Sequence, residues 1–244
     1  IFTHAGFAAA FAQSRLHIHK ADGITLGVPV SLVDSISFVG ISPMLNLSME
    51  LEVSELDIRE IDSLTFGGDS RVVGIRYDGT DARINNPLAY EGVTITRQGA
   101  HVVVNSTTDD EIEYLLSGRA TDGSFKLYSG KKYILTLNGA EITSMDGPAI
   151  NIQSGKKGTV KLVDGTSTVP VDGHTYTPYE DEDMKAAFFS EGQLIFSGGG
   201  TLTVTGNNKH AICSDDYLQF TEGTILVPAA ASDGIHANDY VLID

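Results

Sequence analysis

Two segments close to the end of the chain combine acids, amides and a tyrosine at matching positions. They are KHAICSDDYLQF, residues 209–220, and SDGIHANDYVLI, residues 232–243. Each contains a small residue, an isoleucine, a cluster of Ser, Asp or Asn, a tyrosine and an apolar run. Carboxylate and amide oxygens are the ligands that Ca²⁺ takes in proteins. The oxygen donors at the matching positions are Asp215, Asp216, Asn238 and Asp239.

This repetition places like charges close together if the two segments lie on adjacent strands. Strand neighbours are about 4.8 Å apart, and two carboxylates at that distance repel by roughly 3.5 kcal/mol at an effective dielectric constant near 20. Residues 211–244 contain no lysine or arginine, so a hard cation is the simplest compensating charge. The sequence therefore predicts a calcium site. The alternative is that these acids are solvated turn residues, because Asp and Asn favour turns for local reasons.

Side chains next to the acids predict a ligand-contacting surface. Strand alternation turns Tyr217, Tyr240 and His236 outward. A tyrosine ring offers a flat apolar face against which the C–H groups of a sugar pack, and its hydroxyl remains available for hydrogen bonding. These three residues are the predicted substrate-binding residues. The same alternation predicts a solvated outward column made of Lys126, Asn151, Phe189, Cys213 and His236.

The elements that position these residues follow a long internal repeat. An apolar residue that follows a small one recurs every 23 to 25 residues, apart from one interval of 38. A unit of this length, with short alternating runs such as GTLTVTG, buries its core only by stacking on its neighbours. The pattern predicts an all-β fold, a right-handed parallel β-helix, with an antiparallel β-sandwich as the alternative. The anchors are Phe125, Ile150, Phe188, Ile212 and Ile235.

The interval of 38 residues contains an insertion, residues 164–185. Its glycine, proline and acid content is typical of a loop, so we expect it to leave the coil rather than to add a strand. We expect its acidic run, from Glu180 to Asp183, to be solvated.

The first 85 residues follow a different pattern. LVDSISFVG, residues 32–40, and EIDSLTFGG, residues 60–68, echo one another after strand-like stretches. They predict a small β-rich N-terminal module over residues 15–85, followed by the parallel β-helix over residues 86–244. Residues 1–14 have the apolar character and small-residue ending of a signal-peptide remnant; an amphipathic helix that stays in the mature protein is the alternative.

Composition limits the possible partners. The chain has 244 residues, with 32 Asp or Glu against 16 Lys or Arg, which gives a formal net charge of −16. Such a chain repels nucleic acid, so no nucleic-acid partner is expected. The chain has no run of about 18 apolar residues, so no membrane span is predicted. The single cysteine, Cys213, excludes an internal disulfide and a cysteine-based zinc site.

Two longer stretches resemble a known family. They are LTLNGAEITSMDGPAINIQSGKKGTVKLVDGT, residues 135–166, and AAFFSEGQLIFSGGGTLTVTGNNKHAICSDDYLQFTEGTILVPAAASDGIHANDYVLI, residues 186–243. Both are similar to the bacterial carbohydrate-binding β-helix family, which has a pectate-lyase-like fold and a clostridial member that binds cellulose and pectin. The resemblance covers residues 92–244. Separately, LHIHKADGITLGVPVSLVDSISF, residues 16–38, resembles an element at the start of Bacteroidetes surface and secreted proteins.

The family resemblance implies a right-handed parallel β-helix, calcium bound through the acids Asp215, Asp216 and Asp239, and binding of a plant-type polysaccharide. The family's coil continues beyond the motif DGIHAND, so we expect the β-helix to be truncated at Asp244. We therefore expect a non-catalytic, calcium-dependent polysaccharide-binding protein, secreted or displayed at the cell surface.

Two alternatives remain at this stage. One is a structural or adhesive surface protein, in which the acids need no ligand. The other is a calcium-dependent polysaccharide lyase, which needs a basic residue beside the cation to abstract a proton. The sequence favours binding over catalysis, because a fold shared with lyases does not carry their chemistry. The basic residues nearest to the acids in the sequence are Lys185 and Lys209.

Overall fold

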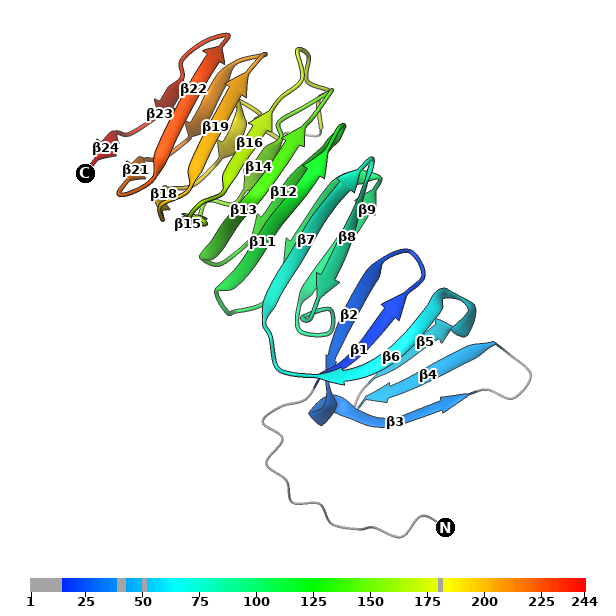
Figure 1. Cartoon of the computed structure of the whole chain (residues 1–244). Coiled ribbons are helices and arrows are strands. Elements are labelled where there is room, and N and C mark those ends of the chain that lie inside the picture. The colour runs from blue at the N-terminus through cyan, green and yellow to red at the C-terminus, as the bar shows by residue number, and fades with distance from the viewer. Residues whose placement is uncertain (1–14, 39–42, 50–51, 180–181) are drawn as a thin grey trace. The chain divides into compact units, whose positions relative to one another are not determined.

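The computed structural model describes residues 15–38, 43–49, 52–179 and 182–244. Within these ranges the regular elements are strands, apart from two short 3₁₀ helices (Figure 1). This content confirms the all-β class. The described residues form two compact units, which divide after Ser70. The expected signal-peptide remnant lies outside the described residues, and no helix in the described part is long and apolar enough to cross a membrane.

The first unit is built from antiparallel strands. Its described strands are β1 (Arg15–Lys20), β2 (Ile24–Pro29), β3 (Val33–Phe38), β4 (Met44–Met49), β5 (Glu52–Asp57) and β6 (Ile61–Gly67). β1 pairs with β2 and β6, and β4 pairs with β3 and β5. The two echoing sequences adopt the same local structure, because η1 (Val30–Leu32) leads into β3 and η2 (Ile58–Glu60) leads into β6.

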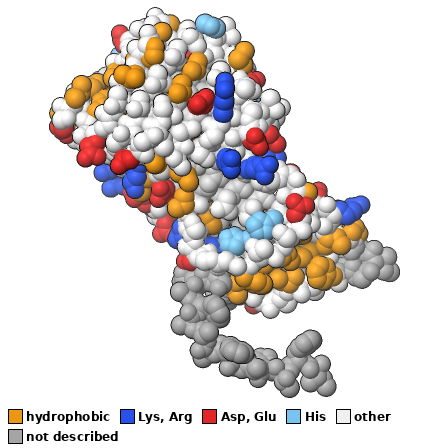
Figure 2. Space-filling model, in the orientation of Figure 1, with side chains coloured by type: hydrophobic (Ala, Val, Ile, Leu, Met, Phe, Trp, Pro, Cys, Tyr) orange, Lys and Arg blue, Asp and Glu red, His pale blue; other side chains and the backbone are white. Residues whose placement is uncertain are grey.

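Apolar side chains of the first unit are divided between a buried set and a surface set. The buried set, each at most 1% exposed, includes Leu16, Ile18, Val28, Leu45 and Leu47. Figure 2 shows hydrophobic side chains on the surface of this unit as well. The exposed large ones are Val30, Leu32, Phe38, Val53, Ile58 and Phe66. The unit therefore combines buried strand faces with apolar outer surface.

The second unit contains three stacks of strands, and neighbouring strands within each stack pair in parallel. One stack contains, in order, β10 (Ala100–Ser106), β12 (Gly123–Ser129), β14 (Ile150–Gln153), β17 (Ala186–Ser190), β20 (His210–Ser214) and β23 (Ile235–Ala237). A second stack contains β7 (Val72–Gly79), β11 (Ile112–Ala120), β13 (Tyr133–Thr143), β15 (Gly158–Leu162), β18 (Leu194–Ser197), β21 (Leu218–Phe220) and β24 (Val241–Ile243). A third stack continues from β13 through β16 (Ser167–Val171), β19 (Thr201–Gly206) and β22 (Thr224–Ala230).

Not all pairing in the second unit is parallel. β8 (Asp81–Asn86) pairs antiparallel with β7, and β9 (Val93–Gln98) pairs antiparallel with β10. The sheets are therefore mixed at the start of the unit and parallel in the later layers (Figure 1).

The register of the first stack agrees with the repeat spacing. Equivalent positions of β12, β14, β17, β20 and β23 are occupied by Phe125, Ile150, Phe188, Ile212 and Ile235. The first four anchors are fully buried, and Ile235 is half-buried. In the second stack the rings of Phe196 and Phe220 are parallel to within 15°, with centroids 4.7 Å apart. Apolar ladders along the stacks thus form the core, and the predicted register is confirmed.

The insertion contributes a strand, which the sequence interpretation did not expect. β16 lies within residues 164–185, yet it pairs with β13 and β19. Thr168 and Pro170 are buried, whereas Ser167, Val169 and Val171 are not. This alternation is the period-2 pattern of a strand. The expected excursion is therefore wrong for residues 167–171, and the chain leaves the stack only after Val171.

The boundary between the two units lies after Ser70 rather than near residue 85. β7 pairs with β11 along its whole length, and β8 folds back onto β7. Residues 71–86 therefore belong to the second unit, because the strand pairing of β7 is made there.

The column that was expected to face solvent is buried in its middle. Asn151 is 2% exposed, and Phe189 and Cys213 are fully buried. The end of the insertion covers these side chains. Lys185 Nζ lies 5.8 Å from the centroid of the Phe189 ring, and Asn151 Nδ2 donates to Glu182 Oε2 at 3.4 Å. Alternation turns these residues away from the core as predicted, but the returning insertion shields them from solvent.

Cys213 is expected to resist thiol reagents in the folded protein. Burial, with a further contribution from the charge of Asp215, raises the pKa of the Cys213 thiol to about 12, and the thiolate is the reactive form. At pH 8 such a thiol is ionised in roughly one molecule in ten thousand, so native labelling should be at least about a hundredfold slower than labelling in urea. A chromogenic disulfide reagent measures both rates, and equal rates would contradict the buried placement.

Candidate functional site

The two acid-bearing segments form equivalent turns in adjacent layers of the second unit. Asp215 and Asp216 lie between β20 and β21, and Asn238 and Asp239 lie between β23 and β24. Backbone N–H groups of Asn238 and Asp239 donate at 3.1 Å to the carbonyls of Ser214 and Asp216. The side-chain amide of Asn238 donates to Asp215 Oδ1 at 3.2 Å. All four predicted cation ligands thus lie on one pair of stacked turns, which we call the acid turns. The carboxylates of Asp215, Asp216 and Asp239 do not form a group of three whose oxygens all lie within 4.8 Å of one another.

A lysine from the insertion supplies positive charge to the acid turns. Lys185 Nζ lies 2.8 and 2.7 Å from the two carboxylate oxygens of Asp215 and 3.0 Å from Asp183 Oδ2. Burial lowers the pKa of Lys185, but the hydrogen bonds and charges of the two aspartates outweigh burial and raise it overall. Sequence reasoning missed this pair because it is 30 residues apart and forms only when the insertion returns.

Lys185 compensates the negative charge only in part. Glu191 follows β17 at the position where Asp215 follows β20. Burial raises the pKa of the Glu191 carboxyl, and the charges of Asp215 and Asp183 raise it further. The carboxylate of Asp216 accepts a hydrogen bond from the Gln193 amide, which adds no charge. Lys185 pairs with only Asp215 and Asp183, so the group retains an excess of negative charge.

The two predicted tyrosines stack on each other. The ring centroids of Tyr217 and Tyr240 lie 4.9 Å apart, and the ring planes are 3° from parallel. Tyr217 is half-buried, whereas Tyr240 is 53% exposed. Because Tyr240 covers one face of the Tyr217 ring, the pair offers a sugar less ring surface than two separate tyrosines would. Tyr240 is therefore the main exposed ring of this pair.

His236 belongs to a different group from the tyrosines. Its ring stacks on that of His210 with centroids 4.4 Å apart, and its Nδ1 lies 3.2 Å from Asp233 Oδ2. Burial lowers the pKa of His210, and the charge of His236 lowers it further. Sequence reasoning missed His210 and Asp233. The available signal was their equal position, two residues before an anchor in each segment.

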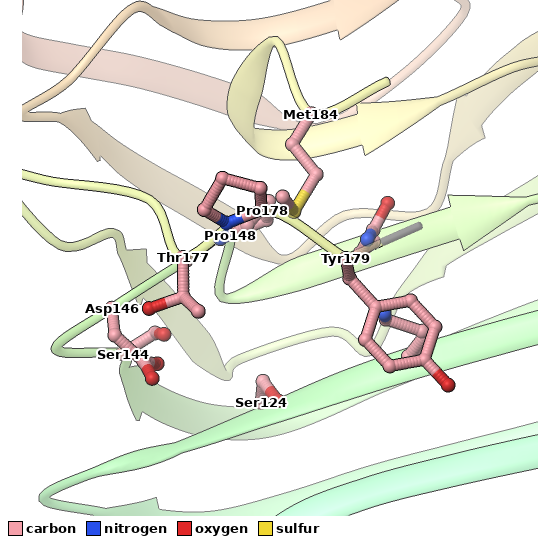
Figure 3. A pocket seen from close by; sticks show the side chains of 11 residues that line it. Ser124, Ser144, Asp146, Pro148, Thr177, Pro178, Tyr179 and Met184 are labelled. Atoms are coloured by element: carbon pink, nitrogen blue, oxygen red, sulfur yellow. The ribbon is translucent and has the colours of Figure 1, made fainter. Parts of the chain in front are cut away.

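A separate hollow lies where the insertion crosses β12 and β14 (Figure 3). Its volume is about 190 Å³. Lys126 Nζ lies 4.1 Å from the centroid of the Tyr179 ring and 2.7 Å from Glu182 Oε2. The Glu182 side chain is only 9% exposed, so it anchors the insertion instead of being solvated as expected. Polar side chains in the lining are Ser124, Lys126, Ser144, Asp146, Asn151 and Thr177.

A family comparison covers the layers that carry these features. Residues 91–244 match the family model described as carbohydrate-binding domain-containing protein. This stretch is more than half of the chain, and it includes the acid turns, the stacked tyrosines and the hollow beside the insertion. The chain therefore belongs to the family of carbohydrate-binding domain-containing proteins.

Two individual proteins are similar to the chain. A carbohydrate-binding domain-containing protein of Acetivibrio thermocellus is 33% identical over 120 residues, which are 48% of this chain and 42% of the relative. The matched region thus spans less than half of that relative. A solved structure of the polysaccharide lyase-like protein from C. thermocellum, a gadolinium derivative, is similar with a TM-score of 0.57 and 24% identity, covering 70% of this chain and 78% of that chain. This second likeness concerns the fold alone.

Removal of the Glu191 charge is expected to stabilise the protein at neutral pH. The folded state raises the pKa of this carboxyl above its usual 4.5. The carboxyl therefore does not reduce the free energy of unfolding at a pH below its unfolded pKa, and it reduces that free energy as the pH rises through the folded pKa. In calcium-free buffer, Glu191→Gln should raise the urea midpoint at about pH 7.5 and leave it unchanged at about pH 3.5.

Glu55→Gln is the matched control, because it removes an exposed carboxylate from β5. It should give no gain that depends on pH. A gain for Glu191→Gln of equal size at both pH values would show that charge repulsion is not the cause.

Proposed function

We propose that this chain is a non-catalytic module that binds plant-type polysaccharide with the help of calcium and acts outside the cell. The observation that carries the proposal is that the family match includes both acid turns, which lie in adjacent layers beside the exposed Tyr240. The leader-like character of residues 1–14 supports an extracellular location, as does the resemblance of residues 16–38 to an element of Bacteroidetes surface proteins.

The proposal includes a right-handed parallel β-helix for the second unit. Its later layers take one strand from each of three stacks, and the strands of each stack pair in parallel. Connections between parallel strands of one sheet are right-handed in nearly all proteins. The likeness to the polysaccharide lyase-like structure also supports this architecture.

The acid turns suit calcium in their chemistry. They offer three carboxylates and one amide oxygen, and Ca²⁺ accepts such mixed oxygen ligands in irregular geometry. Calcium would be held by Asp215, Asp216, Asn238 and Asp239 once their side chains turned toward it, and it would compete with Lys185 for Asp215. The bound ion would supply the positive charge that attracts the carboxylates of a uronate polymer, which an acidic protein otherwise repels.

The stacked tyrosines support contact with sugar. Tyr240 is exposed, and its ring packs on that of Tyr217, which limits its orientations. A side chain that is already ordered loses little freedom on binding. Its apolar surface suits the C–H groups of a sugar ring. We therefore place a sugar contact at Tyr240, next to the acid turns.

Lyase chemistry is the less favoured function. Elimination from a uronate needs a base that is able to accept a proton. Lys185 of the insertion is a basic residue that contacts the acid turns, and its aspartate partners raise its pKa and keep it protonated. The name of the Acetivibrio relative also refers to binding. These observations support a binding module rather than an enzyme.

Calcium binding at the acid turns is the central test. We expect Asp216→Asn/Asp239→Asn to weaken calcium binding at least about tenfold in calorimetric titration of metal-stripped protein, because two ligand charges are lost. Polygalacturonate should bind wild-type protein only in the presence of calcium. The control Asp78→Asn/Asp109→Asn removes two exposed carboxylates from early layers and should bind calcium like wild type.

Lys185→Met tests the same site in the opposite direction. It removes the charge that competes for Asp215 and keeps an apolar stem over Phe189, so calcium should bind more tightly. Polysaccharide binding without any calcium binding would refute the calcium part of the proposal. If the wild-type protein binds neither calcium nor polysaccharide, the structural or adhesive alternative is favoured.

Tyr240→Ala is expected to weaken the binding of soluble oligosaccharides several-fold, because the exposed ring is lost. Tyr240→Phe keeps the ring and should bind within about twofold of wild type. Affinity electrophoresis or calorimetry in the presence of calcium provides the comparison. Equal binding by all three proteins would place the sugar contact elsewhere, for example at the hollow that contains Tyr179.

A further inference from the structure

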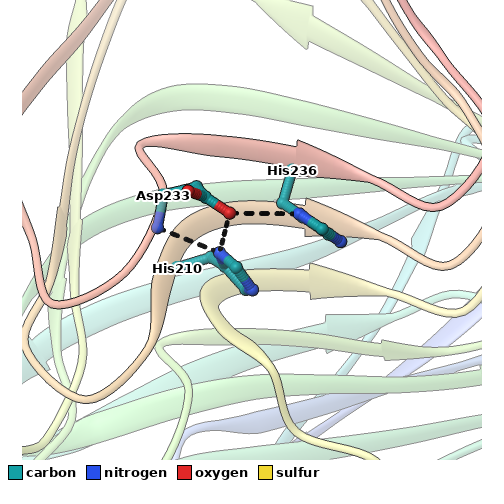
Figure 4. Close-up of side chains that lie close together, drawn as sticks. All are labelled: His210, Asp233 and His236. Atoms are coloured by element: carbon teal, nitrogen blue, oxygen red, sulfur yellow. Dashed lines mark hydrogen bonds and ion pairs between the residues drawn. The ribbon is translucent and has the colours of Figure 1, made fainter.

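Three side chains able to bind metal converge at the edge of β20 and β23 (Figure 4). His210 begins β20, Asp233 lies in the turn before β23, and His236 lies within β23. Nδ1 of His210 and Nδ1 of His236 lie 3.3 and 3.2 Å from the same oxygen, Asp233 Oδ2. Among the described residues, this is the group of three in which His, Cys, Asp or Glu ligand atoms all lie within 4.8 Å of one another.

Hydrogen bonds do not account for every contact in this group. The backbone N–H of Asp233 donates to His210 Nδ1 at 3.1 Å, so this nitrogen presents its lone pair and carries no proton. The same nitrogen lies 3.3 Å from the Asp233 carboxylate, which also has only lone pairs to offer. Two acceptors therefore face each other. A cation bound by both would relieve this contact, and it would replace the backbone N–H of Asp233 at the single lone pair of His210 Nδ1.

Ligand types and distances fit a transition metal ion. Zn²⁺ binds imidazole nitrogen and carboxylate oxygen at about 2.0 to 2.2 Å in tetrahedral sites, which places neighbouring ligand atoms about 3.4 Å apart. The observed separations of 3.3 and 3.2 Å from Asp233 Oδ2 are close to that value. The two rings are stacked at 18° from parallel, so they would rotate on binding for both lone pairs to meet at one ion. Imidazole suits zinc, copper and nickel, whereas calcium selects oxygen ligands.

We propose that His210, Asp233 and His236 bind one divalent transition metal ion, with zinc as the preferred ion. The site shares no ligand with the acid turns, and His210 lies at the opposite end of β20 from Asp215. Three protein ligands leave one tetrahedral position for water or a ligand oxygen. The ion would join adjacent layers through its ligands. Its binding requires neither calcium nor carbohydrate, so the inference does not rest on the proposed function.

Zinc binding to the intact chain tests this site. Competition with a chromogenic chelator should give one zinc ion per chain, and Co²⁺ should give the intense visible bands of a tetrahedral site. His236→Gln and Asp233→Asn should each weaken zinc binding at least about tenfold. His101→Gln is the matched control, because His101 lies 3.5 Å from Asp122 in a pair rather than in a group of three, and it should leave zinc affinity unchanged.

Thermal unfolding separates loss of the site from loss of the fold. Saturating zinc should raise the unfolding midpoint of wild type, but not that of the variants. Circular dichroism in metal-free buffer should be the same for all of them. If His236→Gln fails to fold, Asp233→Asn carries the comparison, because that side chain is 59% exposed. Equal zinc affinity in wild type and the folded variant, or displacement of zinc by excess calcium, would overturn the proposal.

Discussion

The second unit depends on one constraint, the fixed register of its parallel strands. Backbone hydrogen bonds hold equivalent residues of adjacent layers about 4.8 Å apart, and each repeat is too short to bury its own apolar face. Phe125, Ile150, Phe188 and Ile212 are fully buried, and they occupy one register position in successive layers. A shift of one residue would turn the apolar side chains of a layer outward, so burial of the core selects the register.

The same register repeats polar side chains as strictly as apolar ones. Adjacent carboxylates repel, and the acid turns reduce this repulsion in two ways. Asn238 places a neutral amide against Asp215, and Lys185 places a charge there from the insertion. Aromatic residues repeat at little cost, because the rings of Tyr217 and Tyr240 stack at the layer spacing. The positions of the acids, the amide and the tyrosines therefore all follow from the strand register, which burial of the apolar core maintains.

Sequence periodicity predicts the ladder but not what covers it. The anchor positions at Phe188 and Ile212 were predictable, because core burial demands an apolar residue at each repeat. The burial of Cys213 and the partner of Asp215 were not predictable, because both depend on the return path of the insertion, and residues 172–185 have no period. β16 was missed since glycine and proline around it outweighed its short alternation. Asp233 was not predictable from the repeat, because its matching position in the preceding segment carries a different residue type, His210.

A cation bound at either proposed site would link metal binding to layer stacking in the last described layers. Residues 211–244 contain no lysine or arginine, so neither residue type is available within this stretch to pair with its acids. Lys185 pairs with Asp215 from an earlier segment. The acid turns and the His210, Asp233 and His236 group both take their donors from the layers of β20 and β23. An ion that needs donors from two layers binds only when those layers are in register, and its binding free energy then stabilises that register. The register that brings the acids together would therefore also make metal binding a means of holding those layers together.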